Sequence, residues 1–279
     1  MLEMQLQWIR DLHEVLRTPW MDIFFKGWNY VDTLYFDIIV IAFVWYLWNK
    51  RIGARLLYAL MMSLILNKLL KGAFHQPRPC QVDPSVGVVC CTSFGFPSGA
   101  AQTAVILVGC VFIECKRSLY RWFAVIFAAF LCFSRVYLGM HYPTDILGGL
   151  VVGGVLVLAY KKLFPLVEKM WRVAAIAFPF FLLVLGQFLP VSPTWIYYLF
   201  FVNLGVGVGL IMDKKSETKS MQLRIMQTLS VIFGLGVLFA AGFIFPAFQF
   251  LWDFSEGLWL SFLGARLIVD IKKFKNFGF

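Results

Sequence analysis

Long apolar stretches separated by short basic clusters are the feature that most constrains what this chain can fold into. A helix that crosses a membrane needs about 20 mostly apolar residues. Of the 279 residues, 61% are hydrophobic and 14% are charged, whereas a soluble domain is about 25% charged. The sequence therefore predicts an all-α protein, a polytopic bundle that crosses a membrane several times.

Nine transmembrane helices are predicted from the apolar stretches. They cover about residues 33–49, 54–75, 98–115, 119–138, 143–163, 171–190, 195–212, 225–245 and 253–272. Residues 1–19 have apolar side chains at helical spacing and a charged opposite face, so this stretch is too polar to cross. We expect it either to lie on the membrane surface or to pack on the protein's own surface.

Basic residues are concentrated in alternate loops, which indicates the orientation of the chain. One side carries Lys26 and Arg78. The other side carries Lys50, Arg51, Arg55, Lys116, Arg117, Arg121, Lys161, Lys162, Lys169, Arg172, Lys214, Lys215, Lys219, Arg224, Lys272, Lys273 and Lys275. Loops rich in Lys and Arg face the cytoplasm, so we expect the amino terminus outside and the carboxyl terminus in the cytoplasm. This pattern accounts for the net charge of +10 without nucleic-acid binding.

Three of the six cysteines, Cys80, Cys90 and Cys91, fall in the loop between the second and third predicted helices, on the outer side. That compartment permits disulfides. A disulfide of Cys80 with Cys90 or with Cys91 is predicted, and unpaired thiols are the alternative. No spacing of Cys and His indicates a metal site, and no cofactor is expected.

Three short segments hold polar residues that a membrane protein carries only for a reason. They are Lys71–Pro79, Phe96–Ala100 and Ser134–Asp145. They lie at the end of the second predicted helix, at the start of the third, and between the fourth and the fifth. The predicted topology places all of these points on the outer side, so the three segments are expected to meet in one pocket.

The side chains of this pocket suit a phosphate group. Lys71, Arg78 and Arg135 are cations, and arginine can bind phosphate oxygens through two parallel hydrogen bonds. Ser98 and Gly99 begin a predicted helix, whose free N–H groups favour an anion. The segments therefore predict a phosphate-binding site.

His141 and Asp145, four residues apart, add a nucleophile to this site. A carboxylate that binds one ring nitrogen fixes the tautomer and leaves the other nitrogen free to attack. Together the segments resemble the signature of the type 2 phosphatidic acid phosphatase superfamily: Lys-x6-Arg-Pro, then Pro-Ser-Gly-His, then Ser-Arg-x5-His-x3-Asp. The matching residues are Lys71, Arg78, Pro79, Pro97, Ser98, Gly99, Ser134, Arg135, His141 and Asp145.

The resemblance covers about residues 71–145 and implies both a fold and a mechanism. The family's six-helix core would occupy residues 33–190, with an interfacial helix and linker at 1–32 and a transmembrane extension at 191–279. His141 would attack phosphorus and form a phosphohistidine, and Asp145 would orient it. The residues that would hold the phosphate oxygens are Lys71, Arg78, Ser98, Gly99 and Arg135. Since these side chains supply the positive charge, no metal is implied.

Ala100 departs from the signature, which has at this position the histidine that protonates the leaving oxygen. Alanine cannot give a proton, and general acid catalysis contributes about 10²–10⁴ in rate. We therefore expect this chain to bind phosphate but to turn over slowly. Ala100 is either a deliberate substitution or the mark of a natural pseudoenzyme, and the intact remainder of the signature favours the first. His75 is an alternative proton donor, although a solvent-facing loop histidine is the simpler interpretation.

The predicted function is hydrolysis of a phosphate monoester or diphosphate of a lipid, which would reach an extracytoplasmic pocket laterally from the outer leaflet. A sugar phosphatase is the alternative within the enzymes, because the predicted topology looks like that of the membrane glucose-6-phosphatase group as well as that of the sphingosine-phosphate phosphatase group. A non-catalytic protein that binds or transports a phosphorylated ligand is the alternative from another class, and Ala100 supports it.

Overall fold

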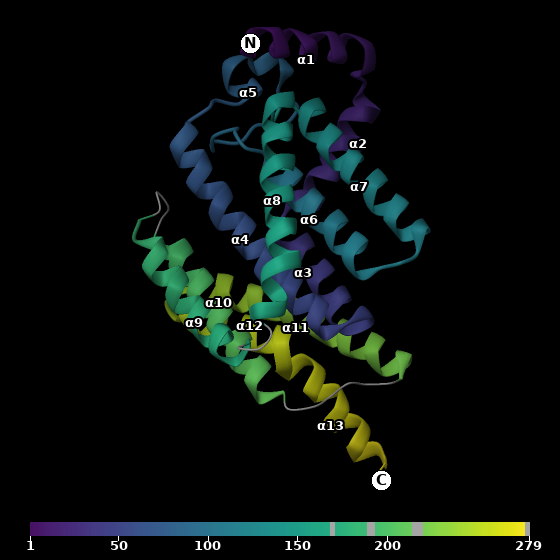
Figure 1. Cartoon of the computed structure of the whole chain (residues 1–279), viewed down its shortest axis with the longest axis vertical. Helices are drawn as coiled ribbons and strands as arrows, with labels where there is room; N and C mark the ends of the chain where they lie inside the picture. The colour runs from purple at the N-terminus through teal and green to yellow at the C-terminus, as the bar shows by residue number, and fades with distance from the viewer. Residues whose placement is uncertain (168–170, 189–192, 214–219, 277–279) are drawn as a thin grey trace. The chain divides into compact units, whose positions relative to one another are not determined.

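The computed structural model describes residues 1–167, 171–188, 193–213 and 220–276, and the regular secondary structure of these residues is helical throughout (Figure 1). The α-helices are α1 (Leu2–Leu16), α2 (Pro19–Asn29), α3 (Leu34–Phe43), α4 (Lys50–Phe74), α5 (Pro79–Val82), α6 (Gly99–Glu114), α7 (Ser118–Tyr137), α8 (Pro143–Val167), α9 (Trp171–Gly186), α10 (Pro193–Met212), α11 (Met221–Ile244), α12 (Gln249–Leu258) and α13 (Gly264–Asn276). The predicted all-α class is confirmed.

Several of these helices can cross a membrane. Five stretches are long and apolar enough, namely Lys50–Val82, Ser118–Tyr137, Pro143–Lys162, Pro193–Met212 and Met221–Ile244. A sixth arises if Pro19–Asp32 and Leu34–Trp48, which meet at an angle of 64°, form one broken span. The prediction of a polytopic membrane protein is therefore confirmed.

The predicted number of nine spans is not reached by these criteria and stays a prediction. Helix α6 and the stretch Val173–Gly186 are apolar but shorter than 18 residues. The last predicted span is divided into α12, a π-helical turn at Trp259–Leu263 and α13. Apolar composition alone did not reveal these interruptions, because it responds to the average of a stretch and not to the continuity of its backbone hydrogen bonds.

Two compact units make up the chain. The site unit consists of Met1–Ile38 and Arg55–Phe164, and the C-terminal unit consists of Ile39–Ala54 and Pro165–Phe279. All three signature segments belong to the site unit. The limits that we expect from the sequence, at 32–33 and 190–191, stay a prediction, and residues 190 and 191 lie outside the described part of the chain, as do Lys169, Lys214, Lys215 and Lys219.

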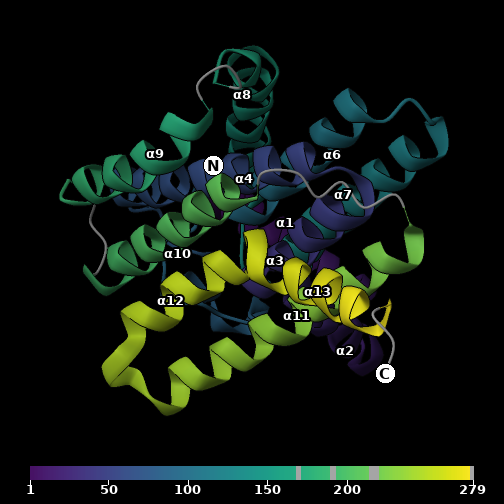
Figure 2. The same cartoon turned by 90° about the horizontal axis from the view of Figure 1, so that it is seen from below.

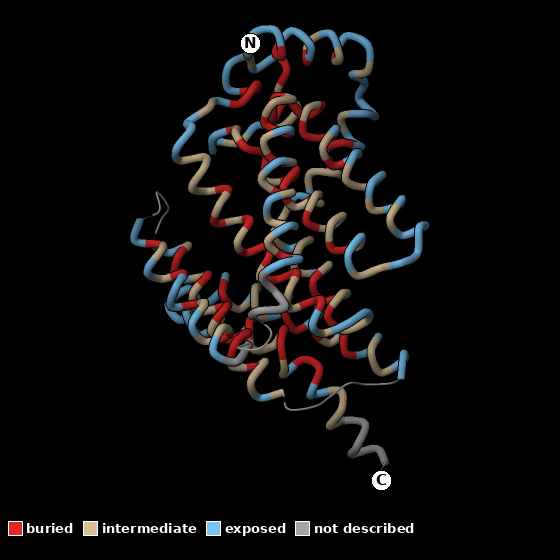
Figure 3. Tube along the Cα trace, viewed as in Figure 1, coloured by how far each residue is buried: buried red, intermediate tan, exposed pale blue. Residues whose placement is uncertain are grey.

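In the site unit, α4 lies inside and α7 outside. In the most apolar 18 residues of the stretch Lys50–Val82, which includes α4, 56% of the residues are buried, whereas in Ser118–Tyr137 the share is 17% (Figure 3). Polar bonds fasten α4 to its neighbours: Ser63 Oγ donates to Gln102 Oε1 at 3.0 Å, and Asn67 Nδ2 donates to the carbonyl of Pro97 at 3.0 Å. A Cβ on Gly149 of α8 would overlap the Ser98 carbonyl oxygen, so glycine here lets α8 approach the start of α6.

The amino-terminal helix α1 packs on the protein itself, which is one of the two alternatives expected from its amphipathic pattern. Leu6 and Ile9 are buried against Val86 and Tyr142. Gln5 Oε1 accepts from the Thr144 backbone N–H at 2.9 Å and from its hydroxyl at 3.0 Å. These contacts fix α1 over the start of α8, close in sequence to His141 and Asp145.

In the C-terminal unit, α10 packs against both α9 and α12 (Figure 2). Its approach to α12 depends on small residues, because a Cβ on Gly205 would overlap the carbonyl oxygen of Phe254. Without a hydrophobic driving force between helices in lipid, such close backbone contact is a main source of helix association.

Candidate phosphate site

The end of α7 delivers the third signature segment to the site. Gly139 has a positive φ of 69°, a conformation that favours glycine at the end of a helix. The backbone N–H groups of Met140 and His141 then donate to the Arg135 carbonyl at 3.1 and 3.3 Å. The chain therefore turns sharply, and His141 is held within one helical turn of Arg135.

The second segment meets the third through its backbone. The Ser98 N–H donates to the Asp145 carbonyl at 2.9 Å, and Ser98 Oγ caps α6 by accepting from the Ala101 N–H at 3.4 Å. Ser98 is fully buried. Together with the bond from Asn67 to Pro97, these contacts join α4, α6 and α8 at the amino end of α6, where free N–H groups favour an anion.

The pair formed by His141 and Asp145 has the arrangement expected of an oriented nucleophile. His141 Nδ1 lies 3.3 Å from Asp145 Oδ2, as the spacing of four residues predicts. Asp145 is itself fixed, because Oδ2 accepts from the Tyr142 N–H at 2.9 Å and Oδ1 accepts from Gln76 Nε2 at 2.6 Å. The bond at Nδ1 leaves Nε2 as the nitrogen that can attack.

The surroundings keep the His141 ring neutral. Burial lowers its pKa well below the ordinary value, and the positive charges of Arg78, Lys71 and Arg135 lower it further. A neutral imidazole carries a free lone pair at neutral pH, as a nucleophile requires.

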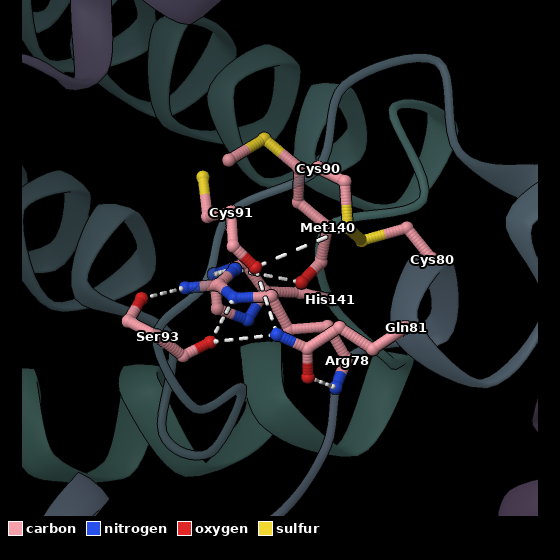
Figure 4. Close-up of a disulfide and its surroundings, with 8 residues drawn as sticks. All are labelled: Arg78, Cys80, Gln81, Cys90, Cys91, Ser93, Met140 and His141. Atoms are coloured by element: carbon pink, nitrogen blue, oxygen red, sulfur yellow. Dashed lines mark hydrogen bonds between the residues drawn. A yellow bond between two sulfur atoms is a disulfide. The ribbon is translucent and has the colours of Figure 1, made fainter.

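Arg78 lies directly at the nucleophile. Its Nη1 is 3.1 Å from His141 Nε2 and donates to the Met140 carbonyl at 2.8 Å. Its Nε donates to the Ser93 carbonyl at 2.7 Å, and its Nη2 donates to Ser93 Oγ at 2.9 Å (Figure 4). The guanidinium is thus held beside His141 Nε2, and a guanidinium in such a position can bind a phosphate oxygen.

A disulfide shapes the loop that holds Arg78. Cys80 is bonded to Cys90, with a Cα–Cα distance of 5.7 Å, and Cys91 is free (Figure 4). This confirms the predicted disulfide and selects one of its two possible partners. The cross-link lies between Arg78 and Ser93 in the sequence and shortens the path of the chain that connects them.

Lys71 stands at the end of α4, close enough to Arg78, Asp32 and Asp145 to interact with their charges. Within the described residues, no hydrogen bond of its ammonium group to another side chain is seen. Lys71 is therefore the signature cation that has the most freedom to bind a phosphate oxygen.

Arg135, by contrast, is already bound. Its Nη1 donates to Asn29 Oδ1 at 2.9 Å and to Asp32 Oδ2 at 3.1 Å, its Nη2 donates to the Trp28 carbonyl at 3.1 Å, and its Nε donates to Ser134 Oγ at 3.1 Å. Its side chain is 0% exposed. A phosphate that binds this guanidinium has to compete with these partners.

Ala100 is buried in an apolar cluster with Ala104 and Leu131. His75, the alternative proton donor expected from the sequence, is exposed and its ring packs on Phe94 at a centroid distance of 4.7 Å. Neither position supplies a proton donor that is bound to the other signature residues.

Several residues at the site were not expected from the sequence. They are Asn29, Asp32, Gln76 and Ser93. Gln76 and Ser93 could have been suspected because they lie in or beside the first two segments. The acidic Asp32, just before an apolar stretch, was a visible signal, because a charge at the edge of a membrane span is retained for a reason.

The part of the sequence that holds the site is similar to known proteins. Residues 52–169 match the family model described as the PAP2 superfamily. Phosphatidylglycerophosphatase B of Bacillus subtilis is 28% identical over 152 residues, which are 50% of this chain and 73% of that protein. Lipid A 1-phosphatase of Rhizobium etli is 31% identical over 142 residues, which are 46% of this chain and 60% of that protein.

Among solved structures, a transmembrane PAP2 type phosphatidylglycerolphosphate phosphatase from Bacillus subtilis is 26% identical, with a TM-score of 0.48 and coverage of 57% of this chain and 84% of that chain.

No group of three or more His, Cys, Asp or Glu side chains that could hold a metal is present in the described residues. The matched range contains all three signature segments. The stretch that holds the site, within residues 52–169, is thus similar to the PAP2 superfamily.

Proposed function

We propose that this chain is an integral membrane phosphatase that hydrolyses a phosphate monoester or diphosphate of a lipid through a phosphohistidine at His141. The observation that carries the proposal is the contact of Arg78 Nη1 with His141 Nε2 at 3.1 Å, opposite the bond from Nδ1 to Asp145. An oriented nucleophile, His141, and a cation that can bind phosphate, Arg78, thus lie within hydrogen-bond distance of each other.

The reaction follows from this geometry. The phosphate group binds Lys71, Arg78 and the amino end of α6. Their positive charges stabilise the negative charge on the phosphate oxygens in the transition state. His141 Nε2 attacks phosphorus while Asp145 stabilises the positive charge that develops on the ring. Water then hydrolyses the phosphohistidine. Because position 100 holds alanine, we expect slower protonation of the leaving oxygen than in proteins with histidine there.

A lipid is the favoured substrate. The two relatives compared above carry names of enzymes that act on phosphorylated lipids, and the site lies at the ends of apolar helices that can cross a membrane. A lipid phosphate held in a bilayer reaches such a site by lateral diffusion. A sugar phosphate such as glucose 6-phosphate serves as the competing substrate in the test below.

We place the site on the extracytoplasmic side. The disulfide of Cys80 and Cys90 supports this location, because disulfides persist in oxidising compartments. The excess of Lys and Arg in the alternate loops supports it independently.

The test uses the full chain, purified in detergent and reconstituted in nanodiscs. Dioctanoyl phosphatidic acid, a short-chain prenyl diphosphate and glucose 6-phosphate are each supplied with and without EDTA, and inorganic phosphate is measured. We expect release from a lipid substrate that EDTA does not reduce. Release from glucose 6-phosphate alone would replace the lipid assignment with the sugar one.

The covalent intermediate is tested with ³²P-labelled substrate, a quench in alkaline SDS, and separate acid and base treatments of the quenched protein. We expect an acid-labile, base-stable label that His141→Gln abolishes and His75→Gln retains. His75 is a suitable control because it is an exposed histidine in the loop that follows α4.

A non-catalytic binding protein is the second candidate, and the bound state of Arg135 favours it together with Ala100. Protection of the chain by phosphate against thermal unfolding, with no label on His141 and no release from any substrate, would select this candidate.

A further inference from the structure

The segment Trp28–Asp32 lies outside the signature and forms hydrogen bonds with Arg135, a signature residue. Three of its groups bind the Arg135 guanidinium: the Trp28 carbonyl, Asn29 Oδ1 and Asp32 Oδ2. The Arg135 side chain is 0% exposed, whereas the Asp32 side chain is 27% exposed. The Asp32 carboxylate thus occupies a phosphate-binding arginine while remaining accessible itself.

Asp32 also lies close enough to the other two cations of the site, Lys71 and Arg78, to interact with their charges. Asp145, a second carboxylate near these cations, is bound to the Nδ1 side of His141. A phosphate group held between the cations would therefore have Asp145 behind the nucleophile and Asp32 as a separate carboxylate in the pocket.

The same segment lies near the position at which the family signature has its proton donor. Trp28 and Val31 pack against the cluster of Ala100, Ala104 and Leu131. The residue that follows Val31 is Asp32, which can carry a proton. One segment thus contacts both the cluster that contains Ala100 and the Arg135 guanidinium.

We propose that Asp32 is the acid–base residue of this pocket and takes the role that histidine at position 100 has in the family signature. The proposal rests on the phosphatase activity proposed above. In the resting site, Asp32 pairs with Arg135. A phosphate group that binds Arg135 displaces the carboxylate, which then stands beside a second negative charge and binds a proton more readily, because like charges repel.

The proton can be followed through both steps. A phosphate monoester monoanion enters and gives its proton to the Asp32 carboxylate. The His141 Nε2 lone pair forms the bond to phosphorus, the bond from phosphorus to the leaving oxygen breaks with its electron pair, and Asp32 returns the proton to that oxygen. In the second step Asp32 takes a proton from the attacking water, the bond from phosphorus to nitrogen breaks, and its electron pair returns to Nε2. Asp32 then gives this proton to the departing phosphate, which leaves as the monoanion and restores the carboxylate.

The experiment compares two leaving groups in the full chain in nanodiscs. The diacylglycerol of dioctanoyl phosphatidic acid would leave as an alkoxide and therefore needs a proton. The leaving group of p-nitrophenyl phosphate is a stable phenolate that needs none. We expect Asp32→Asn to lower kcat for phosphatidic acid by about 10²–10⁴ and kcat for p-nitrophenyl phosphate by less than about 10-fold. Asp22→Asn is the matched control, because Asp22 binds α7 from the same region through Tyr137 at 2.8 Å.

A second measurement shows whether the variant keeps its pocket. Protection by inorganic phosphate against thermal unfolding should be at least as strong in Asp32→Asn as in the unaltered chain, since a neutral side chain competes less for Arg135. Loss of this protection, or an equal loss of kcat on both substrates, would mean that Asp32 only holds Arg135 and would overturn the proposal.

The remaining outcomes are also decisive. A rise in kcat on both substrates in Asp32→Asn would make the segment an inhibitory plug, and unchanged kcat would make Asp32 a spectator; either result overturns the proposal. An unaltered chain that hydrolyses p-nitrophenyl phosphate but not phosphatidic acid would do the same while leaving the phosphatase activity intact. Failure on both substrates with no label on His141 would instead refute the proposed function.

Discussion

Buried polar side chains are used differently in the two units of the chain. In the site unit they bond across long stretches of sequence: Arg78 reaches His141, 63 residues away, and Arg135 reaches Asp32, 103 residues away. In the C-terminal unit, Asn203 and Ser261 each donate to the backbone carbonyl four residues earlier, and Gln249 donates to Asp253 four residues later. This unit also has longer-range bonds, from Tyr198 to Glu256 and from Gln227 to the Ala265 carbonyl.

What distinguishes the site unit is that its long-range bonds connect cations with His141 and with carboxylates. A polar group inside a membrane must be hydrogen-bonded, and a bond within its own helix meets that need locally. A network of charged groups from segments distant in sequence is harder to form. We therefore expect substitutions in the site unit to affect catalysis and equivalent ones in the C-terminal unit to leave it unchanged.

The largest expected effect concerns Asp145. Asp145→Asn should lower kcat by up to about 10⁴, because an amide can hold the wrong tautomer of His141 and cannot stabilise its positive charge. The comparison is Asp253→Asn, a buried aspartate of the C-terminal unit, which should keep kcat. Phosphate release in nanodiscs measures both. Equal losses in the two variants would remove the distinction between the units.

A smaller effect is expected for Arg78. Arg78→Lys keeps the charge but loses the clamp to both Ser93 oxygens and the fork of donors that faces the phosphate. The expected fall in kcat/KM is about 10²–10³. Arg266→Lys, at an exposed ion pair with Asp270, is the control. A lysine that works as well as Arg78 would show that only the charge matters at this position.

Reduction of the disulfide should have a local effect on stability. All six cysteines belong to the site unit, and loss of a disulfide costs about 2–4 kcal/mol. We expect Cys80→Ser to speed amide hydrogen exchange in residues 78–95 and to leave exchange in α10 unchanged. The matched variant is Cys110→Ser, which removes a free thiol. Faster exchange in α10 would show that the two units are stabilised together.

The smallest effect is on the pH profile. Because burial and three cations hold the pKa of His141 well below its ordinary value, the ring stays neutral as the pH falls through 6.5. The acidic limb of kcat/KM for p-nitrophenyl phosphate should therefore have its midpoint below the ordinary histidine pKa of about 6.5. A midpoint at or above that value would show that the nucleophile is not shielded as the structure indicates.

The local part of the site could be predicted from the sequence. The spacing of four residues between His141 and Asp145 places both on one face of a helical start, and the N-cap role of Ser98 follows from its position before α6. The convergence of the three segments followed from counting helices between them, although the count of nine is not reached in the described structure. Only the order of the helices between the segments mattered, and α4, α6, α7 and α8 follow one another as expected.

Thus the sequence alone determined the membrane class, the signature residues and the geometry of neighbours within a turn, since apolar length and helical period are local properties. Tertiary structure alone decided that Cys90 and not Cys91 pairs with Cys80, and that Asp32 and Asn29 occupy Arg135. Arg135 and its partners are distant along the chain, and Cys90 and Cys91 are equally plausible partners of Cys80 in the sequence. They depend on which surfaces pack together, and no periodicity in a single sequence records that.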